Sequence, residues 1–124
     1  MMRIRFTKRF LKDLKHLSKK QPLVRSDVDD FIATLGQGEH PGDRLQGTDD
    51  QAVYKARLSI SGSNRGKSAG YRLIYWVYTA EGIVLLTIYA KNERSDISAN
   101  DVNDILAEAL IDLDIADGDD PDNL

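Results

Sequence analysis

The chain has 124 residues, of which 41% are hydrophobic, so it is long enough for one domain with a single core. It contains no cysteine, which excludes disulfide frameworks, thiolate metal sites and cysteine nucleophiles. The longest apolar run, residues 83–90, is far too short to span a bilayer, and the N-terminus lacks the apolar segment of a signal peptide. We therefore expect a cytoplasmic protein with no membrane partner.

Charge is divided unevenly along the chain. Residues 1–100 hold all 17 lysines and arginines and 11 acidic residues, a net charge of +6, whereas residues 101–124 hold the other 9 acidic residues and no basic one. The basic part favours a polyanionic partner, although a solvated surface beside an acidic end explains the same distribution. We expect one domain over residues 1–113 and a disordered acidic tail over residues 114–124, which have almost no large apolar groups.

The first part of the chain predicts a short strand and a basic helix. Residues 3–6 can form the strand, Thr7 is a suitable N-cap, and apolar residues recur at helical spacing from Phe10 to Leu17. The opposite face of this helix is cationic and consists of Lys8, Arg9, Lys12, Lys15, Lys19 and Lys20. Among these we expect Lys12 and Lys15 to contact RNA.

A second helix is predicted from Pro22 to Gly36, because proline is favoured in a first helical turn and glycine at a helix end. The two helices should pack as a hairpin. Residues 36–51 are rich in glycine, aspartate and proline and predict a loop.

Three strands and a final helix follow. Strands are predicted over residues 53–60, 71–78 and 83–90, the last nearly all apolar, as in a central strand covered on both faces. In the first of them, alternation places Tyr54, Ala56, Leu58 and Ile60 on one face and Val53, Lys55, Arg57 and Ser59 on the other.

Ser98 and Asp101 resemble a capping box before an amphipathic helix that ends near Leu113. The order β-α-α-β-β-β-α predicts an α+β domain, with an N-terminal helical hairpin packed on a small antiparallel sheet.

The segment SGSNRGKSAG, residues 61–70, nearly matches a phosphate-binding P-loop. It contains Gly66-Lys67-Ser68, but Ser61 stands where the first glycine is required, and a strand follows instead of a helix. We expect a hairpin loop that presents Arg65 and Lys67 to RNA, with a solvated turn as the alternative. His16 and His40 have no partner at metal-ligand or triad spacing, so the sequence predicts neither a metal nor a cofactor.

Cations also occur on or just after the predicted strands, at Lys55, Arg57, Arg72 and Lys91. Like charges on one exposed sheet face cost about 1 kcal/mol or less, and an RNA phosphate would compensate them. Aromatic side chains surround these positions: Tyr75, Trp76, Tyr78 and Tyr89. We expect most of them to pack in the core, with base stacking as the alternative.

Three segments, VYKARL, GYRLIYWV and LLTIYAKNERSD, resemble in their order and spacing the RelE/ParE toxins of bacterial type II toxin–antitoxin pairs. RLQG and the glycine- and lysine-rich loop are most similar to the HigB2-like RelE branch. The resemblance runs from about Phe6 to Leu110. It implies a RelE-like fold and a toxin that enters the ribosomal A site and cleaves mRNA there without a metal. It also implies a cognate antitoxin protein as partner.

The resemblance further implies roles for individual residues. Lys55, Arg57 and Arg72 match three basic residues that carry the reaction in the family, with Arg57 in place of a lysine. Asn92 and Ser98 stand where the family has an arginine and a tyrosine, and the substitutes could be Lys91, Arg94 or the loop cations Arg65 and Lys67. We expect Lys55 to act as the base, with the neighbouring arginines disfavouring its ammonium form.

Two other functions remain open at this point. A ParE-like toxin shares the fold but inhibits DNA gyrase and needs no catalytic cations. A non-enzymatic module that binds RNA or a protein would need only the basic surface.

Overall fold

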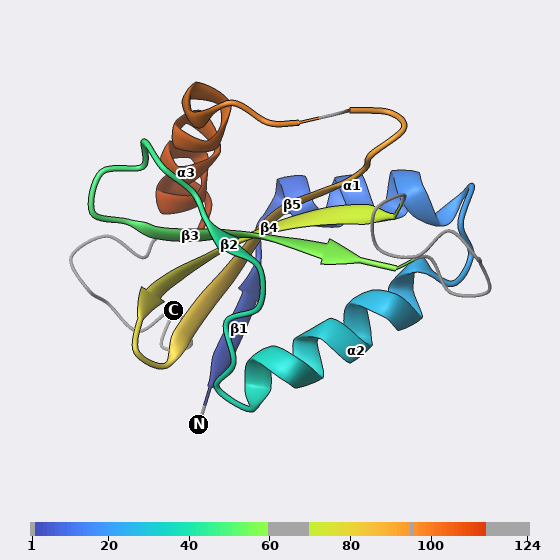
Figure 1. Cartoon of the computed structure of the whole chain (residues 1–124), viewed down its shortest axis with the longest axis horizontal. Coiled ribbons are helices and arrows are strands. Elements are labelled where there is room, and N and C mark those ends of the chain that lie inside the picture. Colours follow the sequence, from blue (N-terminus) through green and yellow to red (C-terminus); the bar gives the residue numbers. More distant parts are fainter. Residues whose placement is uncertain (1, 60–69, 95, 114–124) are drawn as a thin grey trace.

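The structure is a computed structural model that describes residues 2–59, 70–94 and 96–113. Its elements follow in this order: β1 (Arg3–Phe6), α1 (Lys8–Ser18), α2 (Val24–Gly36), β2 (Asp43–Arg44), β3 (Ala52–Leu58), β4 (Tyr71–Thr79), β5 (Gly82–Ala90) and α3 (Ala99–Leu113). The predicted α+β class is confirmed, and Figure 1 shows the strands at the centre with the helices around them. The predictions for the loop at residues 60–69 and the tail at 114–124 lie outside the described residues.

The sheet has five strands in the order β1-β5-β4-β3-β2. Strands β2 to β5 pair antiparallel, as predicted, whereas β1 pairs parallel with β5, so the sheet is mixed. The parallel pair is possible because α1 and α2 form part of a long connection between β1 and the other strands, whereas a hairpin would impose antiparallel pairing. As predicted, β5 is buried on both faces.

Helices α1 and α2 pack on one face of the sheet. Their buried residues include Phe10, Leu14 and Val28, which join Leu73 and Leu85 of the strands in one apolar cluster. The predicted cap is confirmed, because the Thr7 hydroxyl accepts a hydrogen bond from the Phe10 N–H at 2.9 Å. Helix α2 begins at Val24, two residues after the predicted start.

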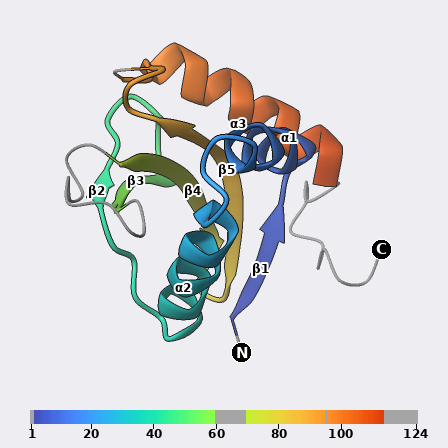
Figure 2. The same cartoon turned by 90° about the vertical axis from the view of Figure 1, so that its right-hand side faces the viewer.

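Helix α3 packs on the opposite face (Figure 2). Val102, Ile105 and Leu106 form a second cluster with strand residues that include Val53 and Trp76. The Ser98 hydroxyl accepts a hydrogen bond from the Asp101 N–H at 3.1 Å, as a capping residue does. No helix within residues 2–59, 70–94 and 96–113 has the length and apolarity needed to cross a membrane.

The predicted loop at residues 36–51 contains the short strand β2. Asp43 lies opposite Lys55, and the Leu45 N–H donates to the Val53 carbonyl at 2.8 Å, so this segment pairs with the outer part of β3. Gly42 has a φ of 103°, a conformation that glycine adopts without steric cost. Strand β2 is only two residues long, too short for its alternation to be recognised in the sequence.

Candidate functional site

Three cationic side chains share one face of neighbouring strands. Lys55 and Arg57 alternate with residues of the first apolar cluster, and both therefore lie on the face of β3 that carries Val53. Arg57 is directly opposite Arg72 of β4, and directly opposite residues point to the same face. We call Lys55, Arg57 and Arg72 the cation cluster.

The members of the cation cluster differ in exposure. Arg72 is buried, with 5% of its surface exposed, and its Nη1 donates to the Tyr71 carbonyl at 3.1 Å. The Lys55 side chain is 21% exposed, whereas Arg57 is an exposed residue. Arg72 is therefore held in a fixed position, and Arg57 can adapt to a ligand from solvent.

An acidic residue that the sequence reasoning did not consider completes this site. Asp96 lies in the loop after β5, and its Oδ1 accepts hydrogen bonds from the Ile97 N–H at 2.8 Å and from Lys55 Nζ at 3.1 Å. These bonds, the backbone one first, hold the pKa of the Asp96 carboxyl below its usual value. Asp96 is thus the anion that compensates the charge of Lys55.

The ion pair with Asp96 bears on the role expected for Lys55. Lys55 Nζ lies 3.1 Å from Asp96 Oδ1, so a carboxylate adjoins it as well as the guanidinium groups of Arg57 and Arg72. A lysine that accepts a proton must first be neutral. The role expected for Lys55 as the base stays a prediction, and the structure places a second candidate proton acceptor, the Asp96 carboxylate, next to it.

Arg94 fixes the loop that carries Asp96. Its Nε donates to the Asp96 carbonyl at 3.0 Å, and its Nη2 donates to the Asp101 carboxylate at the start of α3. Its guanidinium lies 5.8 Å from the centre of the Tyr89 ring, a distance typical of a cation–π contact. Arg94, which was expected to bind RNA, is therefore occupied in bracing this loop.

Tyr89 of β5 is directly opposite Arg72 of β4, so the two side chains lie on the same face of the sheet. Its hydroxyl is buried and has no hydrogen-bond partner among the residues that the structure describes. Burial, followed by the charge of Asp96, raises the pKa of Tyr89 against the opposing effect of Arg94 and Arg72. Tyr89 therefore stays neutral and is a poor proton acceptor.

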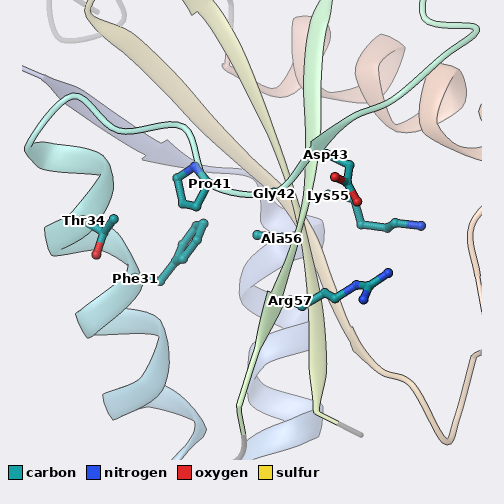
Figure 3. A pocket seen from close by; sticks show the side chains of 8 residues that line it. All are labelled: Phe31, Thr34, Pro41, Gly42, Asp43, Lys55, Ala56 and Arg57. Carbon is teal, nitrogen blue, oxygen red and sulfur yellow. The ribbon is translucent and has the colours of Figure 1, made fainter. Parts of the chain in front are cut away.

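A hollow of about 460 Å³ lies beside β3, between the strand and α2. Figure 3 shows Phe31 and Ala56 pointing into it, whereas the side chains of Lys55 and Arg57 point to the other side of the strand. Lys55 and Arg57 also line the hollow, so the cation cluster borders it along β3. Arg57 is the exposed member of the cation cluster and is accessible to an anion from solvent.

A family model described as the RelE toxin of the RelE / RelB toxin–antitoxin system matches residues 2–117. The chain belongs to the RelE toxin family. The match includes all the described strands and helices, so the β3 and β4 cations and the Asp96 loop belong to the RelE domain itself.

The remaining residues with predicted roles are spread over the RelE domain. Lys91 is exposed in the turn directly after β5, and Lys12 and Lys15 are exposed on α1, which packs on the face opposite to the cation cluster. Arg65 and Lys67 lie outside the described residues. Within residues 2–59, 70–94 and 96–113, no group of three acidic or histidine side chains could hold a metal ion.

The aromatic residues are mainly structural, as expected. Tyr75 is fully buried and its hydroxyl donates to the Pro41 carbonyl at 2.6 Å. Trp76 is 5% exposed and its indole N–H donates to the Gln51 side chain at 3.0 Å. Neither ring is available for stacking on a base.

A second ionic contact ties α1 to the loop after β5. The Glu93 carboxylate lies 3.2 Å from the His16 ring nitrogen and 3.4 Å from Lys20 Nζ. The hydrogen bond with His16, followed by that with Lys20, lowers the pKa of Glu93 in the folded chain. Because the folded pKa is depressed, this contribution to stability is present above the usual value of 4.5 and is lost as the pH falls through the folded pKa.

Replacing Glu93 by glutamine is expected to reduce the free energy of unfolding by about 0.5 kcal/mol at pH 7, since both pairs are solvent-exposed. The difference from wild type should shrink as the pH falls below 4.5, where Glu93 of the unfolded chain is already protonated. Urea unfolding of both proteins between pH 3 and pH 7 measures it, with the exposed Glu39→Gln as control. A difference that grows toward low pH would contradict this account.

Proposed function

We propose that the chain is the toxin of a type II toxin–antitoxin system and acts as a ribosome-dependent mRNA interferase. It cleaves mRNA in the ribosomal A site without a metal and so inhibits translation. Membership of the RelE family makes this activity the first expectation. The observation that carries it is the cation cluster, in which Arg57 of β3 and Arg72 of β4 lie directly opposite each other on one face.

The cation cluster fits the chemistry of RNA cleavage through the 2′-hydroxyl. That reaction needs a proton acceptor for the hydroxyl, stabilisation of the phosphorane, and a proton for the departing 5′-oxygen. Arginine stays charged at all relevant pH values, so Arg57 and Arg72 suit stabilisation of the phosphorane. Lys55, which pairs with Asp96, would add a third basic side chain.

The partners follow from this function. The substrate is mRNA on the ribosome, which places the toxin in the cytoplasm. A cognate antitoxin would neutralise the toxin by covering its basic surface, and we expect its gene to lie beside the toxin gene. RLQG, residues 44–47, and the loop cations Arg65 and Lys67 favour a position in the HigB2-like branch.

The second candidate is a ParE-like inhibitor of DNA gyrase. Such a toxin has no need for cations concentrated on one strand pair, and the facing arginines argue against it. A non-enzymatic module that binds RNA or a protein is the third candidate, and it would use the same charges without cleavage.

Induction of the chain in cells is expected to produce new 5′ ends within translated messages, and purified protein should cut mRNA only when ribosomes are present. Mapping of 5′ ends in a translating extract, with and without the protein, measures this. An untranslated transcript in the same extract is the control. DNA breaks that depend on gyrase, or tight RNA binding without new 5′ ends, would instead support the second or the third candidate.

A further inference from the structure

Asp96 stands among the groups that would surround a bound phosphodiester. Lys55 Nζ from β3 donates to its Oδ1 at 3.1 Å, and the positive charge of Arg72 from β4 contributes to the lowered pKa of its carboxyl. Arg94 of its own loop holds its backbone carbonyl, and Asp101 of α3 and Tyr89 of β5 lie on the other sides of Arg94. The position of Asp96 is therefore defined by its contacts with Lys55 of β3 and with Arg94 and Ile97 of its own loop.

The carboxylate of Asp96 is nevertheless accessible. Its side chain is 68% exposed, whereas the side chain of its partner Lys55 is 21% exposed. Both hydrogen bonds that the carboxylate makes with residues described by the structure end on Oδ1. The second oxygen can thus accept a hydrogen bond from a ligand that arrives from solvent, without breaking the ion pair with Lys55.

One other carboxylate approaches Lys55. Asp43 of β2 is directly opposite Lys55, and Figure 3 shows its side chain on the same side of β3. However, β2 lies beyond β3 as seen from β4, so Asp43 is on the side of Lys55 that faces away from Arg72. Asp96, whose Oδ1 lies 3.1 Å from Lys55 Nζ, is the better placed of the two relative to the cation cluster.

We propose that Asp96 is the catalytic residue that accepts the proton of the 2′-hydroxyl. This inference rests on the proposed function. The proton moves from the 2′-oxygen to the Asp96 carboxylate as the 2′-oxygen bonds to phosphorus. The bond from phosphorus to the 5′-oxygen then breaks, and that oxygen takes a proton from solvent water. The products are a 2′,3′-cyclic phosphate and a 5′-hydroxyl, and Asp96 returns its proton to solvent.

This assignment divides the chemistry according to charge. Lys55, Arg57 and Arg72 bind the phosphate, while the Asp96 carboxylate accepts the proton. It also gives the ion pair a purpose, since Lys55 orients the carboxylate and the Ile97 N–H fixes the same oxygen. A positioned acid–base group contributes typically 100- to 10,000-fold to the rate.

The test uses the isosteric variant Asp96→Asn, which keeps an oxygen for Lys55 and Ile97 but accepts no proton. Single-turnover cleavage of mRNA on purified ribosomes at saturating protein is expected to fall at least about 100-fold. Affinity for ribosomes that carry the same mRNA with a 2′-deoxy nucleotide at the cleavage position should stay within about threefold of wild type. The control variant Asp43→Asn should cleave at a rate near that of wild type.

A second variant separates catalysis from positioning. Asp96→Ala is expected to be equally slow, and added sodium formate should restore cleavage in proportion to its concentration, with sodium chloride at the same ionic strength as control. Rescue by formate but not by chloride is the result expected if the missing group accepts a proton, and no rescue would contradict the proposal.

Several results would overturn the inference. Asp96→Asn could cleave at the wild-type rate, or bind RNA more tightly and cleave faster, in which case Asp96 only competes with phosphate for Lys55. Loss of binding together with cleavage would indicate a positioning role, and a large loss in Asp43→Asn alone would move the role to that residue. Failure of the proposed function is distinguishable from all of these, because wild-type protein would then cut no mRNA.

Discussion

Replacing Arg57 by alanine is expected to lower the rate of mRNA cleavage about 100- to 1000-fold, as for the loss of one preorganised donor to a developing negative charge. The free energy of unfolding should stay the same or rise slightly. Arg57 is exposed and lies directly opposite Arg72, so its removal relieves repulsion between like charges and leaves no buried group without a partner. Single-turnover cleavage on ribosomes and thermal unfolding measure the two effects.

Two matched variants accompany this change. Arg57→Lys keeps the charge but not the planar fork, and an intermediate rate is expected. Arg25→Ala removes an exposed arginine from α2, outside the cation cluster, and should leave the rate unchanged. Wild-type cleavage by the Arg57→Ala protein would remove Arg57 from the mechanism. Arg72 is less suited to this test, because it is 5% exposed and its truncation would also disturb the sheet.

The sequence predicted those helices and strands whose residues repeat with a regular period. Thr7 before an apolar stripe indicated the start of α1, and the alternation around Lys55 and Arg57 placed both cations on one face of β3. Both signals depend on the fixed periods of helix and strand, which hold whatever the rest of the chain does.

Features set by pairing between distant segments could not be read in the same way. The parallel pairing of Arg3 with Gly82 depends on where the long connection returns, and β2 is too short to show a period. In β5 the register shifts, since Ile74 pairs with Thr87 and Tyr75 pairs with Leu85. This bulge changes which residues after Leu85 face α3, and thereby brings Tyr89 opposite Arg72.

In the candidate site, too, the residues on strands were predicted and the residue in a loop was not. Alternation placed Lys55 and Arg57 on one face, and Arg72 joins them because β3 and β4 pair antiparallel with Arg57 directly opposite Arg72. Asp96 was missed because a loop has no period, and its contact with Lys55 joins residues 41 positions apart. The observation that could have pointed to it is chemical, since two cations on one strand face require an anion nearby.

Replacing Gly42 by alanine is expected to reduce the free energy of unfolding by about 2 to 3 kcal/mol. Two costs combine at this position. Its φ of 103° is unfavourable for any residue with a Cβ, at roughly 1 to 2 kcal/mol, and the new Cβ would lie 2.3 Å from the Lys55 carbonyl oxygen. That oxygen belongs to β3, so the clash is relieved only if residues 41–45 move away from the strand. Urea unfolding measures the loss.

The chain offers two glycines that separate these costs. Gly38 has a φ of 90° but no atom within 4 Å of its added Cβ, so Gly38→Ala should lose only about 1 to 2 kcal/mol. Gly36 ends α2 with open space around it, and Gly36→Ala should be neutral or stabilising by up to about 1 kcal/mol. If Gly42→Ala lost no more than Gly38→Ala, the close approach of this segment to Lys55 would not constrain the fold. The positions of β2 and Asp43 beside the cation cluster would then be set by other contacts.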